Sequence, residues 1–499
     1  MEKIKAIGFD MDYTLAMYKS AVFEKLSCDG ALHKLVHVLG YPQEILESTH
    51  YNHSFFIRGL VIDKERGNIL KLDRHRYVKN VLHGFKELNK MEKMKVYEGS
   101  SAKVRGGGNV FQEPDFANLD TIFSIPDAFL FATLVEYKDK HPNEGVLGEK
   151  GYRDLYRDVR RSVDLCHRDG HIKDRVAENP ELFIERDESL VETLVSLRKS
   201  GRKVFLLTNS LWNYTEVVMK FLCGHSERYK EEKWMDLFDL IITGSNKPAF
   251  ILNGQLALYR CDTSTGLLSN TEGPVGMSAK EYLAQGKVFQ GGNWLHLHQL
   301  LEIKDGTRIL YVGDHIYSDV LRSKRTLGWR TMLVIPELKH EIDIMLEPET
   351  KRLAEETIKL KLRREEIEER VDRYELMLLD SEFNDSEEED EDRQEIRRKL
   401  REAKDALQQA RVTIAEATDK LNVRYHPVWG QLFKTGLQNS RFAEQVHGYA
   451  CLYTSKVSNI GLVSPEMHWR TITDIMPHDR IEFTPMRRML KRRSRQHLI

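Results

Sequence analysis

The sequence lacks any apolar run long enough to cross a bilayer, and it has few cysteines and almost no net charge. A spanning helix needs about 20 consecutive apolar residues, and no window comes close. The first apolar segment starts at Ile4, which leaves no room for a cleavable leader. We therefore expect a cytoplasmic protein without a membrane partner. The five scattered cysteines have no metal-ligand spacing and cannot all pair, which predicts reduced thiols; they are Cys28, Cys166, Cys223, Cys261 and Cys451.

The charge balance gives no sign of a nucleic-acid partner. The formal net charge is −1 over 499 residues, and 41% of the residues are hydrophobic, as in ordinary soluble proteins. A chain of this length can form two or three packed units. The segment Arg487–Arg495 is strongly basic and could bind nucleic acid or a membrane, or it could be a solvated terminus. The second interpretation is favoured because no aromatic residue is interleaved there to stack on bases.

Two aspartates follow the first apolar segment, Ile4–Phe9, in the run Asp10-Met-Asp-Tyr-Thr14. Residues i and i+2 of a strand point the same way, so Asp10 and Asp12 would converge as the chain leaves a sheet. One carboxylate can attack phosphorus while the other handles the proton of the leaving group. The alternative is a pair of carboxylates in a solvated turn.

Three later segments repeat this order of a short apolar run followed by small or polar residues. Val204–Leu207 precedes Thr208, Leu240–Ile242 precedes Thr243, and Ile309–Val312 precedes Gly313. Apolar runs without alternation are typical of parallel strands covered on both faces, and helical patterns lie between them. The sequence thus predicts an α/β fold with a doubly wound, Rossmann-like parallel sheet, whose ligands gather at the carboxyl ends of the strands.

The interval of about 190 residues between the first two strands is too long for one crossover helix, so we predict an inserted cap. Near the C-terminus, apolar residues recur at heptad spacing in two charged helices that flank an acidic run. They are Leu353, Leu360, Ile367, Val371, Tyr374 and Leu378, then Ile396, Leu400, Ala403, Leu407, Ala410, Ile414, Ala417 and Leu421. The predicted hairpin could serve an intersubunit contact, or it could be a self-contained folding unit.

The resulting organisation is predicted as follows. Residues 1–18 and 186–345 form the core, 19–185 the cap, 349–421 the helical hairpin with a solvated, disordered acidic turn at 380–392, 422–486 a helical segment packing on the core, and 487–499 a basic tail.

The strand-end clusters supply what a metal-assisted phosphoryl transfer needs. Asp10 is the candidate nucleophile, and Asp12 the candidate acid and base. Thr208 and Asn209 offer donors to a phosphoryl oxygen, and Lys247 offers a positive charge. Carboxylates facing a phosphate require a divalent cation, so we predict Mg²⁺; its candidate ligands are Asp10, Asp12, Asp314 and Asp319.

In this order the motifs resemble those of the haloacid-dehalogenase-like phosphatases. The Asp at position 12 favours a phosphatase or phosphotransferase, because the superfamily's transport ATPases and dehalogenases lack a carboxylate there. More narrowly, the chain resembles the cytosolic purine 5′-nucleotidases that prefer IMP and GMP. The likeness rests on Phe9–Ala16, Tyr41–Glu44, Arg58–Leu60, Gly313–Ile316, Gly328–Thr331 and Val334–Leu338, and more loosely on Trp429–Phe433, Phe442–Val446 and Met476–His478.

This resemblance implies a purine nucleoside monophosphate substrate and a cap that recognises base and sugar. The implied residues are Arg160, Asp164, His167 and Lys173, of which the first three share one helical face at i, i+4 and i+7. A surface Arg–Asp pair is the alternative for Arg160 and Asp164. Tyr137 stands where the family carries a stacking aromatic residue, although a buried cap aromatic fits it nearly as well.

The chain also departs from the family. The vertebrate N-terminal extension is absent, the acidic run lies between heptads, and Leu211 stands where motif two often has Asp. Tyr317 occupies the place of an effector-site aromatic, which alone does not name an effector. We expect a Mg²⁺-dependent 5′-nucleotidase, with phosphotransfer to a second nucleoside as a further activity, a nucleotide effector and a homo-oligomer. The alternatives are a phosphatase of another small ester or of a phosphoprotein, and a scaffold that uses the hairpin.

Overall fold

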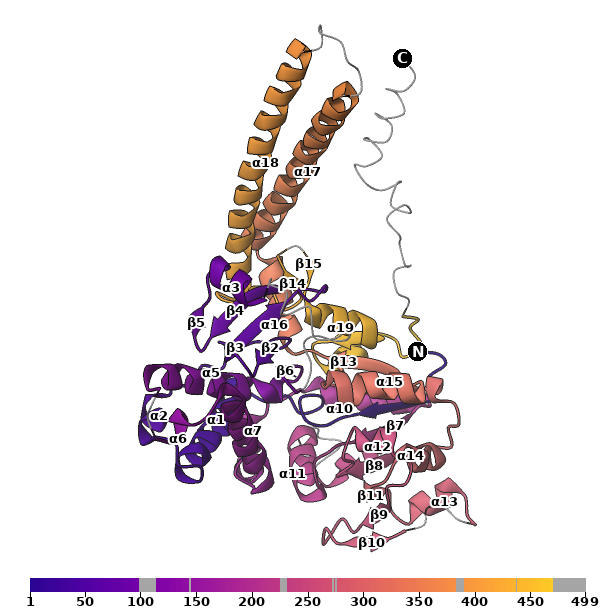
Figure 1. Cartoon of the computed structure of the whole chain (residues 1–499). Coiled ribbons are helices and arrows are strands. Elements are labelled where there is room, and N and C mark those ends of the chain that lie inside the picture. The colour runs from indigo at the N-terminus through magenta and orange to yellow at the C-terminus, as the bar shows by residue number, and fades with distance from the viewer. Residues whose placement is uncertain are drawn as a thin grey trace.

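The core of the computed structural model is a nine-stranded sheet with the strand order β10-β9-β11-β8-β7-β1-β12-β13-β16 (Figure 1). The structure describes residues 1–97, 114–142, 145–224, 231–271, 273, 276–382, 390–436 and 438–469. All neighbouring strands from β11 to β16 pair in parallel, whereas β9 and β10 are antiparallel. The strands are β1 (Ala6–Phe9), β7 (Lys203–Leu207), β8 (Leu240–Thr243), β9 (Leu258–Cys261), β10 (Leu268–Asn270), β11 (Val288–Gly291), β12 (Ile309–Gly313), β13 (Arg330–Val334) and β16 (Leu452–Thr454).

The central strands are buried on both faces, as their unbroken apolar sequences predict. Ile7 and Phe9 of β1 pack into one hydrophobic cluster, with α10 (Ser189–Lys199) and α11 (Trp212–Cys223). Ala6 packs into a second cluster on the other face, with α12 (Ala249–Leu252) and α14 (Trp294–Leu301). The predicted doubly wound α/β sheet is thus confirmed. The remaining core elements are η2 (Glu231–Leu237), α13 (Ala279–Ala284), η3 (Gly306–Arg308), η4 (Ile316–Leu321), α15 (Arg322–Leu327) and α16 (Glu337–Leu346).

The C-terminal segment differs from the all-helical stretch predicted for 422–486. Only residues up to 469 are described, and they contain α19 (Arg441–Tyr449) and η6 (Val457–Leu462) but also β14 (Lys434–Thr435), β15 (Gln438–Asn439) and β16. Because β16 pairs with β13, this segment completes the core sheet. A three-residue strand carries no periodic signal of its own, so only its partner strand reveals it.

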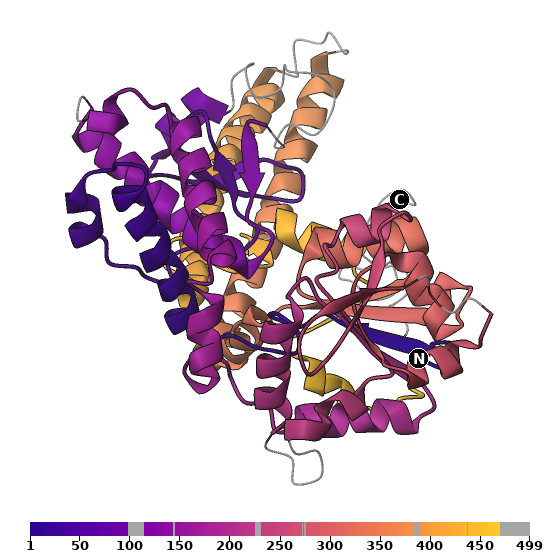
Figure 2. The same cartoon turned by 90° about the horizontal axis from the view of Figure 1, so that it is seen from below.

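The cap lies beside the core as a second lobe (Figure 2). It holds a five-stranded antiparallel sheet of order β5-β4-β3-β2-β6 and a group of packed helices, chiefly α1, α5 and α7. Its strands are β2 (Val61–Asp63), β3 (Asn68–Leu72), β4 (Val78–His83), β5 (Lys86–Glu87) and β6 (Phe116–Asn118). Its helices are α1 (Ser20–His37), α2 (Gln43–Ser48), α3 (Lys90–Tyr97), η1 (Ile122–Ser124), α5 (Ile125–Lys140), α6 (Gly145–Gly148), α7 (Tyr152–Arg168), α8 (Lys173–Glu178) and α9 (Pro180–Phe183).

The chain enters and leaves the cap through two segments that run antiparallel to each other. The Lys19 N–H donates to the Phe183 carbonyl at 2.7 Å, and the Glu185 N–H donates to the Met17 carbonyl at 2.8 Å. Tyr18 and Ile184 pair between them as an isolated antiparallel bridge. This pair of linkers, residues 17–19 and 183–185, lies at the predicted ends of the cap insertion.

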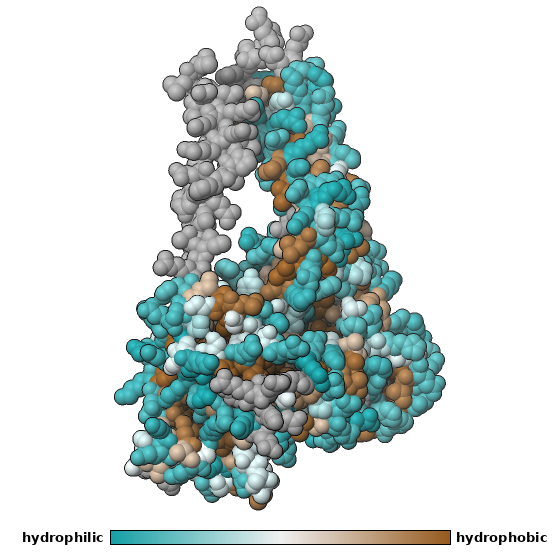
Figure 3. All heavy atoms as spheres, turned by 180° about the vertical axis from the view of Figure 1, so that it is seen from behind, coloured by the Kyte–Doolittle hydropathy of each residue, from teal (hydrophilic) through white to brown (hydrophobic). Residues whose placement is uncertain are grey.

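Two long helices, α17 (Pro348–Glu382) and α18 (Asp390–Tyr425), project from the rest of the molecule (Figure 1). Ile367 and Val371 of α17 pack against Ala403 and Leu407 of α18, at heptad positions that the sequence indicates. The surface of this hairpin is largely hydrophilic, as Figure 3 shows.

Parts of two predictions lie outside the described residues. Residues 383–389 of the acidic turn and the whole basic tail at 487–499 are not described. The end of the acidic run, from Asp390, belongs to α18 rather than to a turn. No helix in the described part of the chain is long and apolar enough to cross a membrane.

Candidate active site

The polar clusters meet at the carboxyl ends of β1, β7, β8 and β12 because these four strands are neighbours in the sheet. Phe9 stands opposite Leu206 of β7 and Val312 of β12. The Asp10 N–H continues the ladder by donating to the Val312 carbonyl at 2.9 Å. Asp10 therefore leaves the sheet between the loops that carry Thr208 and Asp314.

Lys247 joins two of the predicted carboxylates. Its ammonium lies 3.0 Å from Asp10 Oδ1 and 2.8 Å from Asp319 Oδ1, and it donates to the Tyr311 hydroxyl at 2.8 Å. Burial favours the neutral amine, but the charges of Asp10 and Asp319 outweigh it and hold the pKa of Lys247 well above its usual range. The lysine thus stays cationic, as a group facing a phosphate must.

Asp10, Asp314 and Asp319 form a buried carboxylate cluster with one oxygen of each lying within 4.8 Å of the others. Burial, opposed by Lys247 and reinforced by Asp319, raises the pKa of Asp10 to about 7. Burial and the neighbouring Asp319 and Asp10 raise the pKa of Asp314 well above its ordinary value. Three crowded carboxylates carry more negative charge than Lys247 alone can balance, so the cluster favours binding of a further cation. Hard oxygen ligands at this spacing suit Mg²⁺. The residues present fit the predicted cation.

Asp12 does not belong to this cluster among the described residues, although the sequence predicts it as a fourth metal ligand. Its Oδ1 accepts from the Tyr18 hydroxyl at 2.5 Å, and its Oδ2 accepts from the Ser210 hydroxyl at 2.7 Å. Burial and the Asp12 charge keep the pKa of Tyr18 well above its usual range, so the phenol is the donor. The arrangement suits the acid–base role predicted for Asp12, since Asp12 is separate from the metal cluster.

The side chain of Asn209 has a structural role beside the backbone N–H contact to phosphate that the sequence predicts. Its Oδ1 accepts from the Lys247 N–H at 2.6 Å and from the Ser245 hydroxyl at 2.9 Å, and its Nδ2 donates to the Lys247 carbonyl at 3.2 Å. The Asn209 side chain thus fixes the loop that presents the lysine. Thr208 is fully buried beside it, and its hydroxyl accepts from the Ser210 N–H at 3.1 Å.

The cap brings Arg160, Asp164, His167 and Lys173 towards this centre. Arg160 forms ion pairs with Asp164, at 2.7 Å, and with the buried Asp127 of α5. Burial, together with the charges of Lys173 and Arg160, lowers the pKa of His167 to about 4, so its imidazole is neutral. These residues form a polar face at the C-terminal half of α7.

Lys173 connects that face to the core. Its ammonium lies 3.4 Å from the Ser210 hydroxyl and 5.3 Å from the centre of the Tyr214 ring. Since Ser210 donates to Asp12, two hydrogen bonds through Ser210 link the cap lysine to the candidate acid. The structure therefore joins Lys173 of α8 to the strand-end cluster through Ser210.

Tyr137, by contrast, lies beside α2. Its hydroxyl donates to Glu44 at 2.9 Å, and its ring stacks on His141. The aromatic side chain that lies near the polar cap face is Phe123, whose ring contacts those of His167 and Tyr13 edge-on, with ring centres 6.0 Å and 4.7 Å away. The packing of Tyr137 fits the alternative of a buried cap aromatic. The apolar surroundings of Phe123 in the sequence give no signal that separates it from a core residue.

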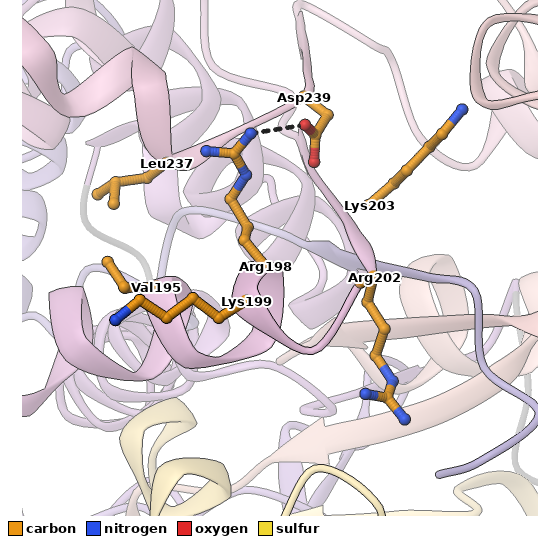
Figure 4. A pocket seen from close by; sticks show the side chains of 8 residues that line it. Val195, Arg198, Lys199, Arg202, Lys203, Leu237 and Asp239 are labelled. Carbon is orange, nitrogen blue, oxygen red and sulfur yellow. Dashed lines mark hydrogen bonds and ion pairs between the residues drawn. The ribbon is translucent and has the colours of Figure 1, made fainter.

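Apart from this site, a hollow of about 430 Å³ at the start of β7 is lined by several cationic side chains (Figure 4). Arg198 pairs there with Asp239 at 2.8 Å, and Lys203 and Arg202 point away from each other. Lys203 is the first residue of β7, so this hollow lies at the edge of the sheet opposite the catalytic centre. Arg198, Arg202 and Lys203 each pair with a carboxylate, so these three cations do not form an anion site.

Comparison with known proteins extends the likeness over most of the chain. The model of the 5′ nucleotidase family matches residues 1–481. The chain belongs to this family. The predicted resemblance to haloacid-dehalogenase-like 5′-nucleotidases is thereby confirmed, and so is the prediction of a hydrolase of the 5′-nucleotidase class.

Two relatives carry the same domain. A 5′-nucleotidase domain-containing protein of Dictyostelium discoideum is 29% identical over 468 residues, which cover 92% of this chain and 70% of the relative. The human 5′-nucleotidase domain-containing protein 2 is 29% identical over 349 residues, which cover 69% of this chain and 63% of the relative. Both relatives are thus longer than the part that this chain matches.

Solved structures give only a loose likeness. A predicted phosphoglycolate phosphatase from Haemophilus somnus aligns at 12% identity with a TM-score of 0.25, over 67% of this chain and 86% of that one. An archaeal β-phosphoglucomutase from a Pyrococcus species aligns at 12% identity with a TM-score of 0.26, over 66% and 87%. At such scores the fold assignment rests on the strand order of this chain and on its family.

Proposed function

We propose that the protein is a Mg²⁺-dependent 5′-nucleotidase that hydrolyses purine nucleoside 5′-monophosphates, IMP and GMP in particular, through an aspartyl-phosphate. The observation that carries the proposal is the convergence of the Asp10–Lys247–Asp319 triad with a cap face that bears Arg160 and Lys173. The triad supplies the chemistry of phosphoryl transfer, and the cap face supplies polar groups for a nucleoside.

The first step forms the intermediate. A carboxylate oxygen of Asp10 attacks phosphorus, and the bond between phosphorus and O5′ breaks with its electron pair going to O5′. Asp12 gives its proton to O5′, so the nucleoside leaves as a neutral alcohol. Lys247, held 3.0 Å from Asp10, offsets the charge on the phosphoryl oxygens.

The second step reverses the role of Asp12. Its carboxylate takes a proton from water, whose oxygen attacks phosphorus while the bond from phosphorus to Asp10 breaks and restores the carboxylate. If a second nucleoside replaced water at this point, phosphotransfer would result. A bound Mg²⁺ would be held by Asp10, Asp314 and Asp319, and it would supply Lewis-acid stabilisation of the phosphate charge.

The preference for a 6-oxo purine rests on the polar face of α7. A 6-oxo purine presents a carbonyl acceptor beside an N–H donor. The Arg160 guanidinium can donate to the carbonyl, and the Asp164 carboxylate, 50% exposed, can accept from the N–H. Cytosine presents the opposite pattern on its exocyclic amine, so it would leave these groups unpaired.

Two further parts of the proposal concern partners. We expect a homo-oligomer and a nucleotide effector, as the family resemblance implies. The aromatic residue Tyr317 lies beside Gln445, whose amide donates to its hydroxyl at 2.7 Å. This contact is compatible with an effector pocket but names no effector.

Steady-state phosphate release from IMP, GMP, AMP, CMP and p-nitrophenyl phosphate with Mg²⁺ tests the assignment. We expect kcat/KM for IMP and GMP to exceed that for CMP and p-nitrophenyl phosphate by about tenfold or more. Equal values for all five substrates would overturn the purine assignment while leaving the phosphatase chemistry intact. Activity on p-nitrophenyl phosphate alone would favour another small phosphate ester.

A further inference from the structure

Tyr18 lies in the linker through which the chain enters the cap. The backbone of this residue pairs with Ile184 of the returning linker, between the hydrogen bonds that Lys19 and Glu185 make across the two segments. Any rotation of the cap relative to the core would have to bend or break these backbone hydrogen bonds. The backbone position of Tyr18 is therefore determined by the cap and the core together.

The hydroxyl of the same residue reaches the reacting centre. It lies 2.5 Å from Asp12 Oδ1 and 2.8 Å from the hydroxyl of Tyr214 on α11. A phenol carries one proton, and Asp12 as a carboxylate can only accept. Tyr18 thus donates to Asp12, and Tyr214 donates in turn to the oxygen of Tyr18.

The Tyr18 ring is wedged between the two lobes. It meets the Tyr13 ring of the core loop edge-on, with ring centres 5.1 Å apart, and it packs on Phe23 of the first cap helix at 4.3 Å. The side chain is nearly inaccessible to solvent, with 3% of its surface exposed. Close packing on both sides leaves the hydroxyl few alternative positions.

A second arm reaches Asp12 from the cap. The Lys173 ammonium lies 3.4 Å from the Ser210 hydroxyl, which donates to the other oxygen of Asp12 at 2.7 Å. One carboxylate oxygen is thereby held by Tyr18 of the linker, and the other by Ser210 of the core, whose hydroxyl the cap lysine contacts.

We propose that Tyr18 is a positioning residue that couples the placement of the cap to the orientation of Asp12, so that the acid faces the leaving oxygen only when the linker ladder is in place. The inference rests on the acid–base role proposed for Asp12, but not on the identity of the base in the substrate. Tyr18 acts through Asp12 and does not touch the phosphoryl group.

The expected signature is a dependence on the leaving group. Misorienting the acid harms reactions whose leaving oxygen needs a proton and spares those whose leaving group departs as a stable anion. Phenyl phosphate and p-nitrophenyl phosphate differ in this respect, since p-nitrophenolate is much the better leaving group. Neither of them carries a nucleobase, so the comparison is independent of nucleotide preference.

The test compares Tyr18→Phe with the wild type in the full-length protein, with Mg²⁺ present. We expect kcat/KM, which reports only the step that forms the aspartyl-phosphate, to fall about tenfold for phenyl phosphate and to change less than about twofold for p-nitrophenyl phosphate. Tyr214→Phe removes only the outer hydrogen bond and should give the same pattern with a smaller loss, about two- to threefold.

Tyr41→Phe is the matched control. Its hydroxyl also donates to a buried carboxylate, Asp158 of the cap, at 2.8 Å, but that pair takes no part in the site. We expect this variant to retain wild-type kcat on both substrates. Circular dichroism and thermal unfolding establish that all three variants are folded.

Equal losses on the two aryl phosphates in Tyr18→Phe, or no loss on either, would overturn the proposal. Failure of the proposed nucleotidase activity would appear separately, as wild-type turnover of aryl phosphates without turnover of nucleotides.

Discussion

The cluster of Asp10, Lys247, Asp314 and Asp319 at the strand ends, here called the floor of the site, differs from the nearby face of the cap in how far its side chains are buried. On the floor, Lys247 and Asp319 have side chains that are 2% and 1% exposed, and they are paired with each other. On the cap, the side chains of Arg160 and Asp164 are 37% and 50% exposed, although they too form a pair. The groups proposed for chemistry are thus fixed before substrate arrives. The groups proposed for recognition can exchange their mutual bond for bonds to a base, while Arg160 stays anchored to the buried Asp127.

The difference has a physical origin. Charges in a buried cluster interact strongly and cannot rearrange without leaving one of them unpaired. A half-exposed helical ion pair is worth only a few tenths of a kcal/mol, so replacing it by contacts to a ligand costs little. We therefore expect changes on the floor to abolish the reaction and changes on the cap to alter the choice of substrate.

The largest expected effect is on the floor. Asp10→Asn replaces the nucleophile by a neutral amide and should lower kcat at least about 1,000-fold on every substrate, nucleotide or aryl. Phosphate release measures the loss. The variant should unfold at the same temperature as the wild type or higher, because one of three crowded carboxylates is gone. Retention of more than a tenth of the activity would contradict the covalent mechanism.

An intermediate effect is expected on the cap. Asp164→Asn should lower kcat/KM for IMP and GMP by about tenfold, because the carboxylate acceptor for the purine N–H is lost, while aryl phosphates change less than about twofold. Asp29→Asn is the matched control, since Asp29 forms an exposed i,i+4 pair with Lys25 and is also 50% exposed. An equal loss on nucleotides and aryl phosphates would mean that Asp164 supports the phosphoryl-transfer reaction itself and not the recognition of the base.

The smallest expected effect is on stability and concerns Glu24, which lies where the cap meets the core. Glu24 of α1 lines, with Glu337 of α16, a hollow of about 700 Å³ between cap and core. Glu24 accepts from the Tyr51 hydroxyl at 2.6 Å, and burial raises its pKa to about 7. A carboxyl whose pKa is higher in the folded state stabilises the fold below pH 4.5, and this contribution is lost as pH rises to 7.

Glu24→Gln should therefore match the wild type near pH 4.5 and exceed its free energy of unfolding by about 1–3 kcal/mol at pH 8. Urea unfolding of both proteins across this range measures the difference, and titrations elsewhere in the molecule cancel because both proteins share them. A difference that is constant with pH would mean that Glu24 stays ionised in the folded state.

The local sequence predicts a feature well when the feature lies at the end of a buried strand or repeats with the period of a helix. Asp10, Lys247 and Asp314 were found because each follows an apolar run that could only be a buried strand, and parallel strands present their ends at one edge. The hairpin was found because Ile367, Val371 and Leu407 keep the heptad spacing that the two helices bury.

Predictions were poorest where a contact joins distant parts of the chain. Tyr137 and Phe123 are both cap aromatics, and only the packing places Phe123, not Tyr137, beside His167. The sequence offered the backbone N–H of Asn209 to a phosphoryl oxygen, but it gave no sign that the Asn209 side chain would bind the Lys247 loop. Short elements such as β16 and the antiparallel extension β9–β10 also escaped, since two to four residues carry no period to detect.

The sequence by itself determined which groups this protein brings to the proposed chemistry: paired aspartates, a lysine and further carboxylates, in the order and spacing of a 5′-nucleotidase. Its tertiary structure alone decided how those groups are divided, with Asp12 held by Tyr18 and Ser210 instead of joining the metal cluster. The reason is that local spacing fixes the strand end at which a side chain emerges, whereas its partners come from residues up to about 200 positions away, brought near only by packing.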